Sequence, residues 1–343
     1  MKRALPWLVL AAILALIAWK LHTSHFDWAG FARSLRTADI KLLAIAVLVI
    51  WSNNVVRAMR WAVFLRPAYK GSGLQPTPWY RLIGSQFIGF TGLAIFGRIG
   101  ELIRPILIAR RTGFDFASQV AVVTVERVFD LGAFGLIFAL NLLLSPQLQT
   151  LPYLHKAGYT IGGLTVVIAV FVAGVRLAGE LVAKVTGSLV GVVSKPAGAL
   201  VAEKILAFRS GLNVIDTFSD FLLATGLSLL LWGTIAATYL LTLKAFPAPV
   251  HDLTLGATIV LMGFSVAGSA LPLPGGGGAW AGNVFALNSL FHIPSELAAS
   301  AGLLVWLVTS MAVIPLGLIF AKVDGVSLGQ VARRSEEAEE AAT

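Results

Sequence analysis

Apolar residues in this chain form long runs separated by short polar stretches, a pattern typical of an all-α integral membrane protein. A membrane-spanning helix needs about 20 mainly apolar residues. The runs that approach or exceed this length cover residues 4–19, 42–65, 120–144, 158–177, 221–243 and 297–321. We therefore expect about six full transmembrane helices.

Two further apolar segments, residues 79–109 and 253–291, are interrupted by glycine and proline. Unwound backbone is tolerated inside a bilayer only where protein covers it or water fills a cavity, so such breaks mark binding sites in transporters. The glycines and prolines that we expect to act as hinges or gates are Gly97, Gly100, Pro272, Pro274, Gly275, Gly276 and Gly278.

Each broken segment could cross the membrane fully or form a re-entrant hairpin that enters and leaves on one side. Hairpins place the excess of Lys and Arg on the side of the N-terminus, whereas a full crossing would move the basic residues of 176–209 outside. The positive-inside rule favours the hairpins and predicts that both termini are cytoplasmic. Helix, hairpin and helix then occur twice in opposite orientation, over 42–144 and 221–321, as an inverted-topology repeat.

This topology divides the chain into five regions. Residues 1–41 are expected to hold a retained signal-anchor helix and an outer loop, and residues 323–343 a disordered acidic tail. The two membrane halves cover 42–178 and 221–322. Between them, 179–220 is less apolar and predicts a cytoplasmic amphipathic segment at the membrane interface.

Composition supports the membrane class and excludes several others. Hydrophobic residues make up 57% of the 343 residues and charged residues 13%, against roughly 25% charged residues in a soluble domain. There is no cysteine, and the five histidines lack metal-ligand spacing, so we expect no metal site and no cofactor. The net charge of +9 lies beside apolar spans, which favours anionic lipid headgroups over nucleic acid as partners.

Asn53, Arg57 and Arg60 form the first group of polar residues inside a predicted span. An ionisable side chain near the bilayer centre costs about 3 kcal/mol, so it needs a partner or a function. At about 100° per residue the three side chains share one face, and two arginines on that face require an anion. Alternatively, Arg60 extends to the lipid headgroups beside Trp61.

Arg98, Glu101 and Arg104 form the second group, within the first break. Their spacing of three lets opposite charges meet if the segment is helical. Two arginines at a hairpin tip could bind a phosphate bidentately, with Glu101 balancing their charge or carrying a proton. The structural alternative is a knot of ion pairs that stabilises the turn.

Glu126, Arg127 and Asp130 form the third group. Glu126 and Asp130 are four residues apart, so they share a helix face that arginines of the other groups could satisfy. Local pairing of Arg127 with Asp130 is the alternative. Arginines outnumber acids in the three groups together, which suits an anionic headgroup. The predicted substrate-binding residues are Arg57, Arg60, Arg98, Glu101, Arg104, Glu126, Arg127 and Asp130.

Three motifs resemble those of a known family. They are Gly97-Arg98-Ile99-Gly100-Glu101 with Arg104, Arg110 and Gly113, then Glu126-Arg127-x-x-Asp130, then Pro274-Gly275-Gly276-x-Gly278. In order and spacing, over roughly residues 40–320, the chain resembles the flippase-like transmembrane family related to lysylphosphatidylglycerol synthase. This resemblance implies a bacterial inner-membrane protein that handles phospholipids or isoprenoid-type or hopanoid lipids.

The chain departs from that family pattern in two places. Members that transfer an aminoacyl group carry a soluble synthase domain after the membrane part, whereas this chain ends soon after its last predicted helix. We therefore do not expect synthesis of lysylphosphatidylglycerol. The glycine-rich motif of the family usually continues to a glutamate, and Ala281 stands at the matching position, with only the neutral Asn283 and Asn288 nearby.

These patterns favour a protein that is not an enzyme and that translocates an anionic or isoprenoid-type lipid. Two alternatives stay open. One is a membrane enzyme of phospholipid, hopanoid or isoprenoid lipid metabolism that uses carboxylates as acid and base. The other is a scaffold that recruits lipid-synthesis enzymes through residues 179–220.

Overall fold

A computed structural model describes residues 26–145, 152–211, 215, 217–271, 273, 276–327 and 329 of the chain. The residues in these ranges form helices and no strand, which confirms the all-α class. The predicted helix at 4–19 lies outside the described residues, as do Pro272, Pro274, Gly275 and most of the predicted acidic tail at 323–343.

In the described part of the chain, four helical segments are long and apolar enough to cross a membrane. They are α3 (Ile40–Tyr69), α6 (Phe116–Leu144), α10 (Phe218–Lys244) and the segment Ser295–Val323. The last consists of α13 (Ser295–Trp306), the π-helix η5 (Leu307–Met311) and α14 (Ile314–Val323). The chain is therefore a multi-pass membrane protein.

The expected number of six spans is not confirmed. Residues 158–177 lie within α8 (Pro152–Val193), which is helical but is not among the four segments. Leu164, Val167 and Val170 on this helix are more than half exposed. These apolar side chains offer no polar atoms to water, so the surface suits contact with lipid.

The described chain divides into two compact units. Unit 1 contains residues 26–50 and 236–312, and unit 2 contains residues 51–235 and those from 313 onward. Because α3 and α10 cross the boundaries at 50 and 235, each helix contributes one part to each unit.

The first broken segment forms a helical hairpin in unit 2. It consists of α4 (Trp79–Phe96), the 3₁₀-helix η1 (Gly97–Leu102) and α5 (Ile103–Thr112), with α5 packed against α4. At 1.5 Å per residue the ten residues of α5 extend only about 15 Å, half of the hydrocarbon thickness. The hairpin is thus observed, and its entry from the cytoplasmic side stays a prediction.

Two glycines shape this turn. Gly97 has a φ of +65°, which favours glycine. A Cβ atom at Gly100 would lie 2.1 Å from the carbonyl oxygen of Gly92, so the backbones of η1 and α4 touch. The remainder of α4 packs on α14, where Phe87 stacks on Phe320.

The second broken segment forms a hairpin in unit 1. It consists of α11 (Leu255–Gly268), α12 (Gly277–Phe285) and the π-helix η4 (Ala286–Leu290). A Cβ atom at Gly268 would lie 2.2 Å from the oxygen of Gly278, and one at Gly282 would lie 2.2 Å from the oxygen of Phe264. The two arms therefore meet backbone to backbone. Helix α2 (Trp28–Arg36), also in this unit, packs on α13.

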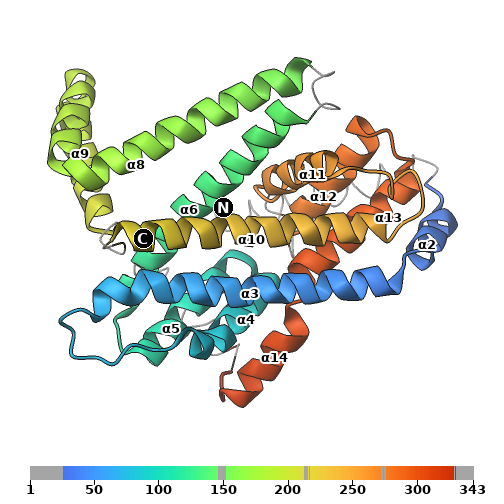
Figure 1. Cartoon of the computed structure of the whole chain (residues 1–343), viewed down its shortest axis with the longest axis horizontal. Coiled ribbons are helices and arrows are strands. Elements are labelled where there is room, and N and C mark those ends of the chain that lie inside the picture. The colour runs from blue at the N-terminus through green and yellow to red at the C-terminus, as the bar shows by residue number, and fades with distance from the viewer. Residues whose placement is uncertain are drawn as a thin grey trace, which may run out of the picture. The chain divides into compact units, whose positions relative to one another are not determined.

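The region between the membrane halves forms a hairpin of its own. Helix α8 has non-helical dihedrals at Ala178, where the first half was expected to end, and α9 (Lys195–Gly211) packs along its C-terminal part (Figure 1). Ile205 on α9 joins the hydrophobic core of unit 2, together with Trp61 and Phe64. Placement of this region at the membrane interface stays a prediction.

Gly100→Ala tests the backbone contact at the first hairpin. The added methyl group meets backbone atoms that cannot rotate away, so we expect a loss of about 1–3 kcal/mol and a clearly lower midpoint of thermal unfolding in detergent. Gly132→Ala on α6 is the matched control, because a Cβ atom there has no neighbour within 4 Å. Equal midpoints for the two variants would contradict the close contact.

Candidate functional site

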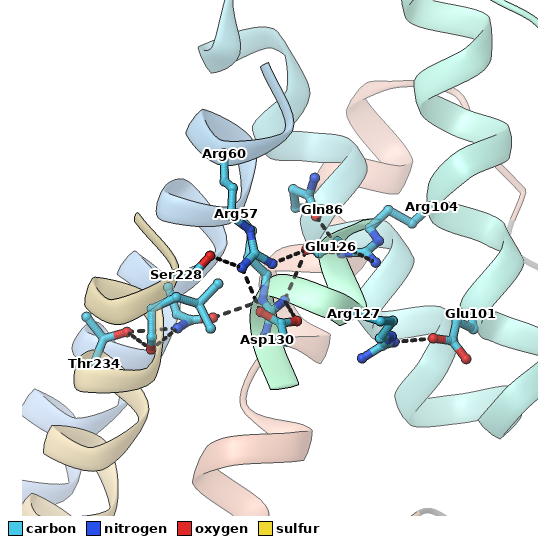
Figure 2. A network of polar contacts seen from close by, with 12 residues as sticks. Arg57, Arg60, Gln86, Glu101, Arg104, Glu126, Arg127, Asp130, Ser228 and Thr234 are labelled. Carbon is cyan, nitrogen blue, oxygen red and sulfur yellow. Dashed lines mark hydrogen bonds and ion pairs between the residues drawn. The ribbon is translucent and has the colours of Figure 1, made fainter. Parts of the chain in front are cut away.

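Unit 2 contains a buried cluster of five charged side chains from three helices (Figure 2). Arg57 and Arg60 come from α3, Arg104 from α5, and Glu126 and Asp130 from α6. The predicted shared faces are observed, since the two arginines of α3 and the two acids of α6 point toward one another. The Arg57 side chain is 12% exposed and the other four are more deeply buried.

Glu126 lies at the centre of this cluster. Its Oε1 accepts hydrogen bonds from Arg60 Nη2 at 2.7 Å, Arg104 Nη1 at 3.2 Å and Arg57 Nη1 at 3.3 Å. Its Oε2 lies 2.6 Å from Arg104 Nη2. One carboxylate therefore binds three arginines, and it joins α3, α5 and α6 at one point.

Asp130 provides the second carboxylate. Its Oδ1 accepts a hydrogen bond from Arg60 Nη1 at 2.6 Å, and its Oδ2 lies 3.8 Å from Arg57 Nη1. Arg60 Nη1 also donates to Ser228 Oγ on α10 at 2.8 Å. Arg60 is thus fully buried rather than extended toward headgroups.

Asn53 extends the cluster toward α10. Its Oδ1 accepts from Arg57 Nε at 3.1 Å, while its Nδ2 donates to the Leu231 carbonyl and to Thr234 Oγ1. The predicted position of Asn53 on the same helix face as Arg57 is thus observed, and its side chain bridges Arg57 and α10.

Aromatic and amide side chains hold Arg104 in place. Its guanidinium lies 4.7 Å from the centroid of the Trp61 ring and 5.1 Å from that of Phe90, within cation–π range. Gln86 Oε1 accepts from Arg104 Nη1 at 3.3 Å, and Gln119 Oε1 accepts from Trp61 Nε1 at 3.0 Å. Sequence reasoning missed these four residues, although Gln86 and Gln119 are polar residues within largely apolar stretches.

Among the described side chains of the second predicted group, Glu101 and Arg104 do not pair with each other as their spacing suggested. Arg104 turns to Glu126, whereas Glu101 binds Arg127 at the edge of the site. Local pairing of Arg127 with Asp130 is therefore not observed either. The Arg127 side chain is 49% exposed, so this pair is accessible. The side chain of Arg98 lies outside the described part of the structure.

A half-open hollow connects the accessible pair to the buried cluster. Its free interior volume is only about 10 Å³, and it is lined by Gly89, Phe90, Leu93, Glu101, Arg104 and Arg127. One water molecule needs about 10–15 Å³, so a phosphate group fits here only when the lining side chains move apart.

The charges of the buried cluster do not cancel. Three arginines face two carboxylates, which leaves one positive charge, and the Glu101–Arg127 pair adds none. An unbalanced buried charge is costly, so the cluster is electrostatically suited to an anion. In the described residues no group of acids, histidines or cysteines could hold a metal ion.

The helices and the buried cluster together define a multi-pass membrane protein with charged residues inside the membrane region. Residues 7–317 match the family model of the lysylphosphatidylglycerol synthase transmembrane region, and the chain belongs to this family. The glycosyltransferase AglD of Haloferax volcanii is 26% identical over 295 residues, which cover 79% of this chain and 46% of that protein. The chain thus spans about half the length of this relative. No solved structure matches the present chain.

Glu126→Gln tests the central role of this carboxylate. The substitution keeps the shape but leaves three arginines against one acid, so we expect a loss of about 3–5 kcal/mol in unfolding free energy. Thermal or denaturant unfolding in detergent measures the loss, with Glu203→Gln at an exposed position of α9 as the control. Adding Arg57→Gln to Glu126→Gln should recover part of the loss, because it removes one unpaired cation. Strictly additive losses would contradict the direct coupling of Arg57 and Glu126.

Proposed function

We propose that the protein is a flippase-like transporter of the inner membrane that binds the phosphate of an anionic lipid and moves that lipid across the bilayer. The observation that carries this proposal is the unbalanced arginine cluster, which reaches the surface through Arg104 and Arg127. Guanidinium groups bind phosphate oxygens bidentately, and burial strengthens such contacts.

In this proposal the headgroup enters through the hollow at the first hairpin. The phosphate exchanges with Glu101 at Arg127 and then meets Arg104, whose guanidinium is already oriented by Glu126 and Trp61. The acyl chains remain in the lipid, so the hollow has to widen for the phosphate only. Movement of η1 about Gly97 would provide this widening.

The arrangement favours transport over catalysis. Glu126 and Asp130 are both bound to arginines, so neither carboxylate is free to act as a general base. Broken helices beside buried charges are the arrangement that transporters use at their substrate sites. Membership of a transmembrane family with a lipid-related name agrees with a lipid substrate.

A lipid-modifying membrane enzyme is the second candidate. It is favoured by the name of the relative from Haloferax volcanii, a glycosyltransferase, although the match covers only 46% of that protein. Mass spectrometry of labelled lipid after incubation with the purified protein separates the candidates, since an enzyme forms a new lipid and a transporter does not.

Arg104→Gln should reduce lipid movement tenfold or more, because it removes charge-assisted hydrogen bonds worth about 1.5–3 kcal/mol each. The measurement uses phosphatidylcholine vesicles that contain the protein and fluorescent phosphatidylglycerol, and it follows quenching of the outer leaflet.

Arg127→Gln should weaken transport without unfolding the chain, because Arg127 is half exposed.

Arg81→Gln on α4 is the control and should transport at the wild-type rate, because this arginine is exposed and lies outside the hollow. Folding of each variant is checked by its unfolding midpoint. A folded Arg104→Gln protein that moves phosphatidylglycerol at the wild-type rate would contradict the proposed mechanism.

A further inference from the structure

Unit 1 contains a second buried polar cluster, beside the second hairpin, in which no side chain carries a charge. Tyr239 on α10 donates a hydrogen bond to Ser265 Oγ on α11 at 2.8 Å. The side chains of Asn283 on α12 and Thr309 in η5 also face the Tyr239 hydroxyl. Tyr239, Ser265 and Asn283 are all buried.

Asn283 is the anomalous member of this cluster. Its side chain is 0% exposed, and it faces the Tyr239 hydroxyl, but within the described structure neither its Oδ1 nor its Nδ2 makes a hydrogen bond of normal length and angle. A buried amide without partners is costly, so natural proteins keep one only for a reason. The amide offers two N–H donors and one acceptor that an incoming polar group could use.

Trp306 on α13 supplies another unused donor, beside the start of α12 and about two helical turns before Asn283. Its indole Nε1 is buried and without a partner among the described residues. Trp306 lies one helical turn after Gly302, where a Cβ atom would be 3.4 Å from Cβ of Asn283. A Cβ atom at Gly276 would be 3.7 Å from Trp306 Nε1, so this donor lies close to the start of α12.

The position of this cluster parallels that of the arginine cluster. Tyr239 stands on the helix before its hairpin, as Arg57 does, and Asn283 stands on the second arm, as Arg104 does. Each helix–hairpin–helix series therefore places buried polar side chains at corresponding elements. The series in unit 2 uses charged groups and the series in unit 1 uses neutral ones.

We propose that Asn283, Tyr239 and Trp306 form a second binding site, which takes an uncharged hydroxyl-rich group, namely the sugar or polyol headgroup of a lipid. A hydroxyl both donates and accepts, so it can satisfy the N–H donors and the carbonyl of Asn283 together. A cation would face unpaired N–H donors, and an anion would find no positive side chain in the cluster. Tyr and Trp supply the apolar surface that ligand sites usually combine with a few polar groups.

The site is tested by thermal unfolding of the full-length protein in detergent, with monoglucosyl diacylglycerol as the probe and diacylglycerol as its sugar-free match. We expect the glycolipid, and not diacylglycerol, to raise the unfolding midpoint of the wild type by several degrees. Asn283→Leu should abolish this shift. Without lipid the same variant should be at least as stable as the wild type, because it removes an unpaired buried amide.

Two further variants separate this site from the arginine cluster. Asn288→Leu, at an exposed asparagine near the end of the same hairpin, should keep the glycolipid shift. Arg104→Gln should also keep it, although it is expected to lose transport of phosphatidylglycerol, so the two proposals can fail separately. The second site is overturned if the wild type responds equally to both lipids or if Asn283→Leu retains the shift. It is also overturned if Asn283→Leu is less stable than the wild type without lipid, because the amide would then already be satisfied, for example by bound water.

Discussion

The contact of one carboxylate with three guanidinium groups is the interaction on which unit 2 depends. Charged side chains are expensive inside a membrane region, and Glu126 makes three of them tolerable by binding Arg57, Arg60 and Arg104 together. Because these arginines come from α3 and α5, the same contact fixes the first hairpin against the helices on either side of it. Removal of Glu126 would release the hairpin and leave its arginine exposed to an apolar environment.

The same cluster links stability to function through its incomplete neutralisation. Asp130 balances only one more arginine, so one positive charge remains beside a hollow whose outer edge is the exchangeable Glu101–Arg127 pair. The cluster is therefore stable enough to persist in the membrane and still favours an anionic group. Both buried carboxylates are occupied in this role, which is why the arrangement suits binding and movement of a lipid better than acid–base chemistry.

The second hairpin meets its constraints differently. Its arms touch through glycine backbones, and its buried polar residues are neutral, with Ala281 at the position where the chain departs from the family pattern that it resembles. A neutral cluster costs less to bury than a charged one, but its unpaired amide at Asn283 still requires a partner. The two halves of the chain thus share an order of elements while offering different chemistry to a ligand.

Local patterns allowed much of this to be predicted from the sequence. The length of the apolar runs predicted the helices around 42–65 and 120–144, and glycine predicted the break at 97–100. The shared faces of Arg57 with Arg60 and of Glu126 with Asp130 followed because a helix repeats every 3.6 residues whatever surrounds it. The number of spans and the side of each hairpin remain predictions.

The choice of ion-pair partners was decided only by the tertiary structure. Arg104 turns to Glu126 and Glu101 to Arg127, although Glu101 and Arg104 are three residues apart. The roles of Gln86, Gln119 and Asn283 appeared only in the folded chain as well. Sequence spacing fixes neighbours within one helix, whereas a partner on another helix is set by packing distance and by the high cost of leaving a buried charge unpaired.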